Sequence, residues 1–243
     1  MLGLCIKAEN TKLRRSVVWL AALLIPVIPA IMGTFNYLQN AEILTGAWYS
    51  LWSQFTLFYS LLFYAPLIGI YCSYLWRLEH MDHNWNILMT MPVSLSRIFA
   101  GKLFIILKVT LFTQLWVFIL FVIAGKYVGF PGFPPLEIFL WTLRGTLAAA
   151  AIGALQLLLS MCIRSFAIPI GIALMGGCAG LVLSNLGLGL WWPYSLLMTG
   201  MNSNSYEDKL SGGVLPFLVS TLLFFLLFSG ISICLLKHKD VKA

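Results

Sequence analysis

Six apolar segments, each about as long as a bilayer is thick, make up most of this sequence. A helix that crosses the hydrocarbon core needs about 20 mostly apolar residues. The segments that meet this length cover approximately residues 17–37, 52–76, 103–124, 137–162, 167–190 and 214–236. We therefore expect a polytopic membrane protein with six transmembrane segments, in one membrane domain over residues 1–243.

The composition supports lipid as the solvent. Hydrophobic residues make up 60% of the 243 residues and charged residues only 9%, whereas a soluble domain is about half apolar and a quarter charged. Backbone groups in hydrocarbon must pair within the chain, so a span is a helix or a barrel strand. Strands would alternate apolar and polar residues, but runs such as LVSTLLFFLLFSGISICLL are continuous. The expected fold class is all-α.

Lysine and arginine residues predict the orientation of the chain. The side that we assign to the cytoplasm carries Lys7, Lys12, Arg14, Arg15, Arg77, Arg97, Lys102, Arg164, Lys237, Lys239 and Lys242. Only Lys126 and Lys209 lie on the other side. The positive-inside rule then places both termini in the cytoplasm, and a cleaved signal peptide would break this alternation. Basic residues at the ends of spans form no stripe, so we expect no nucleic-acid partner.

The loop RLEHMDHNWNILMTMPVSLSRIFAGK, residues 77–102, is polar although it lies between two spans. Read as one helix, residues 79–90 place four apolar side chains on one face. These are Met81, Trp85, Leu88 and Met89, and the polar remainder is Glu79, His80, Asp82, His83, Asn84 and Asn86. Pro92 would end this helix, and Ser94 or Ser96 could cap the next one. We expect a short amphipathic helix between spans two and three.

Three interpretations of this helix compete. It can be a solvated interfacial helix without a partner. It can hold a metal through His80, His83, Glu79 and Asp82, but zinc sites usually take further ligands from elsewhere, so we expect no metal. The third interpretation is a docking element. Its apolar face, with Trp85 and Leu88, would sit on the membrane boundary, and its polar residues would form an exposed ridge that inserts into a cytosolic partner and carries the partner's motion into spans two and three.

The sequence resembles the permease subunits of type-2 ATP-binding-cassette (ABC) exporters, in the branch with the lantibiotic-immunity permeases. The similarity lies in KAENTKLRRSVVWLAALLIP with Glu9 and Lys12, in the loop with Glu79, Trp85, Pro92-Val93-Ser94 and Gly101-Lys102, and in WWPYSLLMTGM before the last span. This resemblance implies that residues 1–16 form a cytoplasmic amphipathic segment and that residues 77–102 form the coupling loop for an ATPase subunit. It also implies that residues 191–213 form an extracellular segment with short re-entrant helices.

The same resemblance implies the partners and the cargo. The expected partners are two copies of a cytosolic ABC ATPase, which binds ATP and magnesium, and a second permease chain, identical or homologous. The cargo would be an antimicrobial peptide expelled across a bacterial plasma membrane, as in lantibiotic immunity or resistance. The alternatives are another cargo, such as a lipid, drug or polyketide, or a non-transporting scaffold or sensor.

The chain has no motif that would supply energy or catalysis by itself. A P-loop needs G-x-x-x-x-G-K-[ST], but Gly101-Lys102 is followed by Leu103 and Gly125-Lys126 by Tyr127. The sequence contains no HExxH motif, which a zinc metalloprotease would need. It also has no aspartate, glutamate or histidine at the middle of a span, where an ion-coupled carrier tends to place them. We expect no cofactor on this chain.

Several residues inside the spans are further candidates. Arg144, well inside span four, marks a pathway or extends to the headgroups. Tyr59, Tyr64 and Tyr71 in span two need polar partners and could face a pathway or a permease interface, because this span lies near the dimer interface in the family. Small residues that allow close helix packing are Gly145, Ala149, Gly153, Gly176 and Gly180. We expect them to pack within one subunit rather than at a dimer face.

Overall fold

The computed structural model describes residues 1–81, 84–205, 210 and 213–238. All the regular elements in these residues are helices. The α-helices are α1 (Leu2–Leu13), α2 (Val17–Leu24), α3 (Val27–Gln39), α4 (Trp48–Phe58), α5 (Tyr64–His80), α6 (Asn84–Thr90), α7 (Leu95–Val128), α8 (Leu136–Cys162), α9 (Ala167–Asn185), α10 (Ser195–Gly200) and α11 (Val214–His238). A π-helical turn, η1 (Tyr59–Phe63), joins α4 to α5, and η2 (Gly189–Trp191) is a 3-10 turn.

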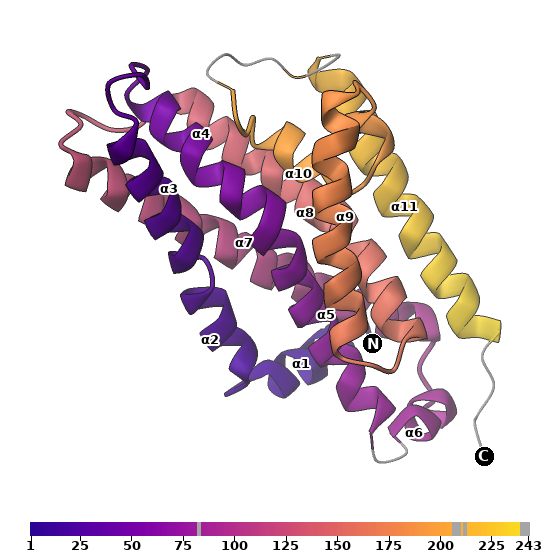
Figure 1. Ribbon diagram of the computed structural model, residues 1–243. Helices are drawn as coiled ribbons and strands as arrows, with labels where there is room; N and C mark the ends of the chain where they lie inside the picture. The colour runs from indigo at the N-terminus through magenta and orange to yellow at the C-terminus, as the bar shows by residue number, and fades with distance from the viewer. Residues whose placement is uncertain (82–83, 206–209, 211–212, 239–243) are drawn as a thin grey trace.

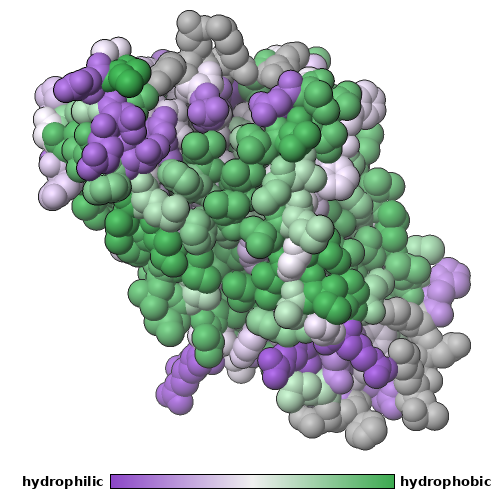
Figure 2. All heavy atoms as spheres, viewed as in Figure 1, coloured by the Kyte–Doolittle hydropathy of each residue, from purple (hydrophilic) through white to green (hydrophobic). Residues whose placement is uncertain are grey.

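The six spans expected from the sequence are confirmed. Six helical segments of the described chain are long and apolar enough to cross a membrane, and they cover Val17–Gln39, Trp48–His80, Leu95–Val128, Leu136–Cys162, Ala167–Asn185 and Val214–His238. Figure 1 shows them side by side as one bundle. Figure 2 shows a wide hydrophobic band around the visible face, with hydrophilic residues at both ends. This band matches a protein surrounded by lipid.

Helix α8 lies at the centre of the bundle, where it packs against α5, α7, α10 and α11. Most side chains of α11 are exposed, as expected for a Leu- and Phe-rich helix that faces lipid. The first span breaks at Pro26, which separates α2 from α3 because proline lacks the amide hydrogen that would continue the helix.

The second span contains the π-helical turn. The Tyr64 amide donates to the Tyr59 carbonyl five residues earlier, and Pro66, in the next turn, has no amide to offer to the preceding carbonyls. The extra residue stacks the rings of Tyr59 and Tyr64 with their centroids 4.7 Å apart. Such turns are rare and often lie at functional sites.

The chain between α9 and α11 enters the bundle. Helix α10 packs against α8 and α9, as Figure 1 shows, and most of its side chains are buried. The Trp52 indole donates to the Met201 carbonyl at 2.7 Å, and the Gln156 amide donates to the Tyr194 hydroxyl at 2.7 Å. A short helix expected in residues 191–213 is present as α10, whereas the extracellular, re-entrant position of this segment stays a prediction. Residues 206–209, 211 and 212 lie outside the described chain.

Candidate functional site

A buried ion cluster ties three helices together at the end of the bundle that holds α1 and α6. Lys102 of α7 is 0% exposed. Its ammonium donates to both carboxylate oxygens of Glu9 at 3.1 Å and to Glu79 Oε1 at 2.7 Å. Lys12 donates to Glu9 Oε1 at 2.9 Å and also to Glu79. Two lysines and two glutamates thus join α1, the end of α5 and the start of α7.

The charges in this cluster compensate one another. A buried charge is tolerated only when it is paired and hydrogen-bonded, and Lys102 also lies 5.0 Å from the centre of the Trp76 ring. Burial alone would lower the pKa of Lys12, but the nearby carboxylates of Glu9 and Glu79 outweigh burial and raise this pKa above its usual value. The two carboxylates therefore stabilise the charged form of Lys12.

The predicted single helix over residues 79–90 is wrong. Helix α5 continues to His80 and ends at Met81, which has an extended backbone, and α6 begins at Asn84. Glu79 and His80 thus belong to the second span. They point into the protein, Glu79 in the ion cluster and His80 with its Nε2 3.1 Å from the Ser160 carbonyl. Neither side chain forms the exposed polar ridge that the sequence predicted.

Helix α6 is held against the end of α5 by its own side chains. The Trp85 ring stacks on His80 with centroids 5.5 Å apart and lies 6.0 Å from the Trp76 ring. The Asn84 amide donates to the Leu78 carbonyl at 2.9 Å and so satisfies a carbonyl at the end of α5. Leu88 is buried and Met89 is partly buried. The predicted seat of Trp85 and Leu88 on the membrane boundary is instead a seat on the protein.

The exposed surface at the end of α6 includes two apolar side chains, Ile87 of the helix and Met91 directly after it. Ile87 is 53% exposed and Met91 48%, and Thr90 between them is also exposed. A cavity of about 400 Å³ opens between α1 and α6; Ile87, Leu88 and Met91 line one side, and Glu9 and Glu79 also reach it. Met81, predicted to lie on the same face as Trp85, is exposed.

A metal site does not form from the described part of this loop. Asp82 and His83 lie outside the described residues. Among the residues that are described, no group of three or more histidine, cysteine, aspartate or glutamate side chains could hold a metal ion.

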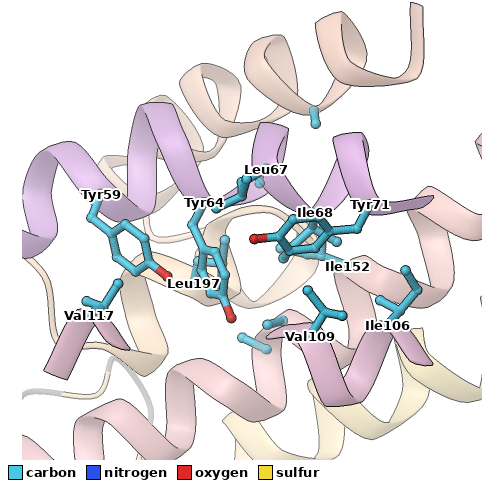
Figure 3. Packing of buried hydrophobic residues seen from close by; sticks show 14 of the residues in the cluster. Tyr59, Tyr64, Leu67, Ile68, Tyr71, Ile106, Val109, Val117, Ile152 and Leu197 are labelled. Carbon is cyan, nitrogen blue, oxygen red and sulfur yellow. The ribbon is translucent and has the colours of Figure 1, made fainter. Parts of the chain in front are cut away.

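The three tyrosines of the second span lie inside the subunit. Each hydroxyl meets a polar partner on α7: Tyr59 donates to Gln114 Oε1 at 2.9 Å, Tyr64 donates to the Thr110 carbonyl at 3.1 Å, and Tyr71 lies 2.9 Å from Thr113 Oγ1. Figure 3 shows the three rings on one side of their helix among apolar residues. Each is at most 1% exposed, so these rings are covered by residues of the subunit itself. That the second span lies near a second permease chain or a pathway stays a prediction. The role of the tyrosines within the subunit is to join α5 and η1 to α7.

Arg144 does not extend along the lipid-facing surface. Its side chain is buried at 9% exposure, in the part of α8 that contacts α10, and a Cβ on Gly200 would lie 3.1 Å from the Arg144 backbone. The arginine is therefore enclosed by protein, which is the surrounding expected of a functional or paired intramembrane charge.

The small residues of α8 and α9 lie at close helix contacts within the subunit. A Cβ added at Gly145 would lie 2.6 Å from the Met201 side chain, at Gly153 2.9 Å from Ile106, at Gly176 2.4 Å from the Tyr194 ring and at Gly180 3.0 Å from the Ser195 amide. Ala149 is fully buried. Three of these contacts are made with residues 194–201, so the small residues make room for this segment.

Sequence reasoning did not predict the cluster that Glu79 forms with Lys12, Lys102 and Glu9; it used the two lysines only for the orientation of the chain. Otherwise Glu9, Lys12 and Lys102 were visible only as parts of the motifs that resemble ABC permeases. A lysine in an apolar stretch at the start of a span, with glutamates at two distant positions, was the available signal. Their pairing spans 93 positions in the sequence, so spacing could not predict it.

Together the bundle and this site define a multi-pass membrane protein. A short helix outside the apolar band packs against the end of α5, and buried charges join that end of α5 to α1 and α7. A sequence model of the family described as ABC-2 family transporter protein matches residues 5–180. This range includes the ion cluster and α6, and it covers most of the chain. The chain belongs to the ABC-2 family of transporter proteins.

It is therefore a membrane permease, a transport subunit, and membership of the family implies an ATPase partner. No match was found among curated proteins or among solved structures.

Proposed function

We propose that this permease receives the motion of a separate ATPase subunit through the exposed face of α6. The observation that carries the proposal is the position of α6, outside the apolar band and attached by Trp85 to the end of α5. The ion cluster joins that end of α5 to α7 and α1. The docking surface consists of Ile87, Thr90 and Met91, in place of the polar ridge expected from the sequence. Exposed apolar side chains in contact with water are typical of protein interfaces.

The attachment of α6 suggests how a push is passed on. Residues 81–94 connect the second span directly to the third. Glu79 lies just before this connection and Lys102 lies after it, and Lys102 Nζ is 2.7 Å from Glu79 Oε1. A displacement of α6 therefore moves α5 and α7 together, and Glu9 carries the displacement to α1. Hydrogen bonds from Tyr59 and Tyr64 to α7 keep the same two helices together deeper in the membrane.

The orientation and the assembly follow from this proposal. An ATPase in the cytoplasm requires the end with α1 and α6 to face the cytoplasm, as the lysine and arginine distribution predicts. Two ATPase copies, with ATP and magnesium, and a second permease chain would complete the transporter. The membrane would be the bacterial plasma membrane.

The cargo that we propose is an antimicrobial peptide, expelled as a means of immunity or resistance. The support is the resemblance of three segments to lantibiotic-immunity permeases and the large lipid-facing apolar surface, from which an amphipathic peptide could enter sideways. A lipid, drug or polyketide cargo is the alternative outcome of the cargo test.

The docking proposal is tested by co-purification with a co-expressed ABC ATPase. Ile87→Glu together with Met91→Glu places two charges in the proposed interface, and we expect at least about a tenfold loss of ATPase binding, because hot-spot residues contribute 2 kcal/mol or more. Phe133→Glu, at an exposed loop position in the opposite end of the bundle, is the matched control. Retention of the ATPase by the double variant at the level of this control would refute the docking surface.

The cargo proposal is tested separately in cells. Expression of the chain with its ATPase should lower sensitivity to at least one member of a lantibiotic panel, and the double variant should restore that sensitivity. Equal sensitivity to the whole panel with and without the transporter would refute the proposed peptide cargo and would not affect the docking proposal.

A further inference from the structure

A basic surface on the outside of the bundle, where α1, α2 and α7 meet, is not used by the proposed coupling mechanism. Lys108 of α7 is exposed, although it lies in a span, and so are Arg14 and Arg15 between α1 and α2. No carboxylate of the described residues forms an ion pair with any of the three, because all four described ion pairs belong to the cluster of Lys12 and Lys102. Arg14 and Arg15 directly follow α1, and Lys108 contacts the same helix through Asn10. Three positive charges therefore lie around the end of α1, and none of them has a carboxylate partner among the described residues.

Specific contacts hold Lys108 against the end of α1. The Lys108 ammonium donates to Asn10 Oδ1 at 2.7 Å and lies 5.9 Å from the centre of the Trp19 ring. The Trp19 indole in turn donates to the Leu13 carbonyl, at 3.1 Å, at the end of α1. Arg15 has a left-handed backbone, with φ of 67°, which turns the chain from α1 into α2. Such a conformation costs about 1–3 kcal/mol and persists only where the surroundings fix it.

An apolar track continues from Lys108 toward the centre of the membrane. Leu111 and Leu115 follow on the same stripe of α7, three and seven residues later, and both are exposed. Phe112 lies beside this stripe and meets the Trp19 ring edge-on, with centroids 5.4 Å apart. The surface therefore offers cationic groups at one end and an apolar strip, as long as part of an acyl chain, at the other.

We propose that this surface binds an anionic phospholipid, with its phosphate among Lys108, Arg14 and Arg15 and one acyl chain along Leu111 and Leu115. The charge complementarity is direct: a lipid phosphate supplies the counter-charge that the described protein residues do not. Basic residues close to a membrane surface each favour anionic lipid by about 1 kcal/mol. The site lies apart from α6 and does not depend on the ATPase proposal.

Native mass spectrometry of the full chain in detergent tests this site, with phosphatidylglycerol and phosphatidylcholine of the same acyl chains as probes. The triple variant Arg14→Gln, Arg15→Gln and Lys108→Gln should bind phosphatidylglycerol at least about tenfold more weakly, and Lys108→Gln alone about fivefold more weakly. Phosphatidylcholine binding should stay the same. Lys108→Arg, which keeps the charge, should retain most of the phosphatidylglycerol binding.

Lys237→Gln is the matched control, since it removes an exposed charge at the same end of the bundle. An equal loss with this control would show that diffuse surface charge, and not a site, attracts the lipid. Equal binding of the two lipids by the native chain would overturn the proposal, as would displacement of phosphatidylglycerol by equimolar glycerol phosphate. If the triple variant does not fold, Lys108→Gln against Lys237→Gln decides the question.

Discussion

Lys102 is the residue on which the coupling site depends most. Replacement by methionine keeps the length of the side chain but leaves Glu9 and Glu79 with only the partly exposed Lys12. Breaking a buried ion pair by removing one partner costs about 3–5 kcal/mol. We expect Lys102→Met to lower the free energy of unfolding by about this amount in a denaturant titration of the purified chain.

Two further variants separate charge from packing. Lys126→Met, near the other end of α7, removes an exposed lysine and should leave the unfolding midpoint nearly unchanged. Adding Glu79→Gln to Lys102→Met should recover part of the lost stability, because one uncompensated carboxylate is neutralised. No recovery in the double variant would mean that the loss comes from packing around Lys102 and not from charge.

Gln114 offers a second test at the residue scale. It accepts the hydrogen bond of Tyr59 at 2.9 Å and donates to the Thr142 carbonyl at 3.3 Å. Gln114→Leu leaves the buried Tyr59 hydroxyl without this acceptor, which should cost about 1–3 kcal/mol of unfolding free energy. Combining it with Tyr59→Phe should cost less than the sum of the two single changes. Strict additivity in this cycle would contradict the contact between α7 and the second span.

At the scale of elements, α9 depends on close approach to the π-helical turn. A Cβ at Gly177 would lie 2.4 Å from the Leu61 carbonyl oxygen, a backbone atom that cannot rotate away, whereas nothing lies within 4 Å of a Cβ at Gly171. Gly177→Ala should therefore lower the thermal unfolding midpoint, by the equivalent of about 1–3 kcal/mol. Gly171→Ala on the same helix should leave it unchanged or raise it slightly.

The connection between the second and third spans shows where sequence reasoning about elements fails. The interruption at Met81 resets the helical phase, so the faces expected for residues 79–90 do not apply on either side of it. Glu79 follows the phase of α5 and turns inward, and Trp85 follows the phase of α6. Hydrophobic periodicity cannot locate such a break. The hydrogen bond from the Asn84 side chain to the Leu78 carbonyl accompanies it, but asparagine occurs in many loops and gives no specific signal.

At the scale of the whole molecule, the sequence predicted the six spans well, because hydrophobic length is a strong and local signal. It predicted less of the site. The ion cluster joins positions 9, 12, 79 and 102 through tertiary contacts, and the tyrosines of the second span find their partners on α7 inside the subunit. These pairings depend on how the helices pack and not on any one segment.

The two helices next to the coupling site are joined to each other at two depths. Helices α5 and α7 are joined at one end by Glu79 and Lys102 and deeper in the membrane by Tyr59, Tyr64 and Tyr71. We therefore expect them to move as one unit. A spin-label pair on the exposed residues Met81 and Arg97, near the ends of the two helices, should keep its distance in both nucleotide states of the assembled transporter. A change of several ångström in this distance between the two states would contradict the joint movement of α5 and α7.

Photo-crosslinking in cells tests the docking of α6 most directly. A photoreactive amino acid at position 87, in a chain expressed with its ABC ATPase, should form a covalent adduct with the ATPase, and the same group at position 133 should not. If position 87 gives no ATPase adduct while the complex still assembles, α6 does not bind the ATPase and the account is wrong.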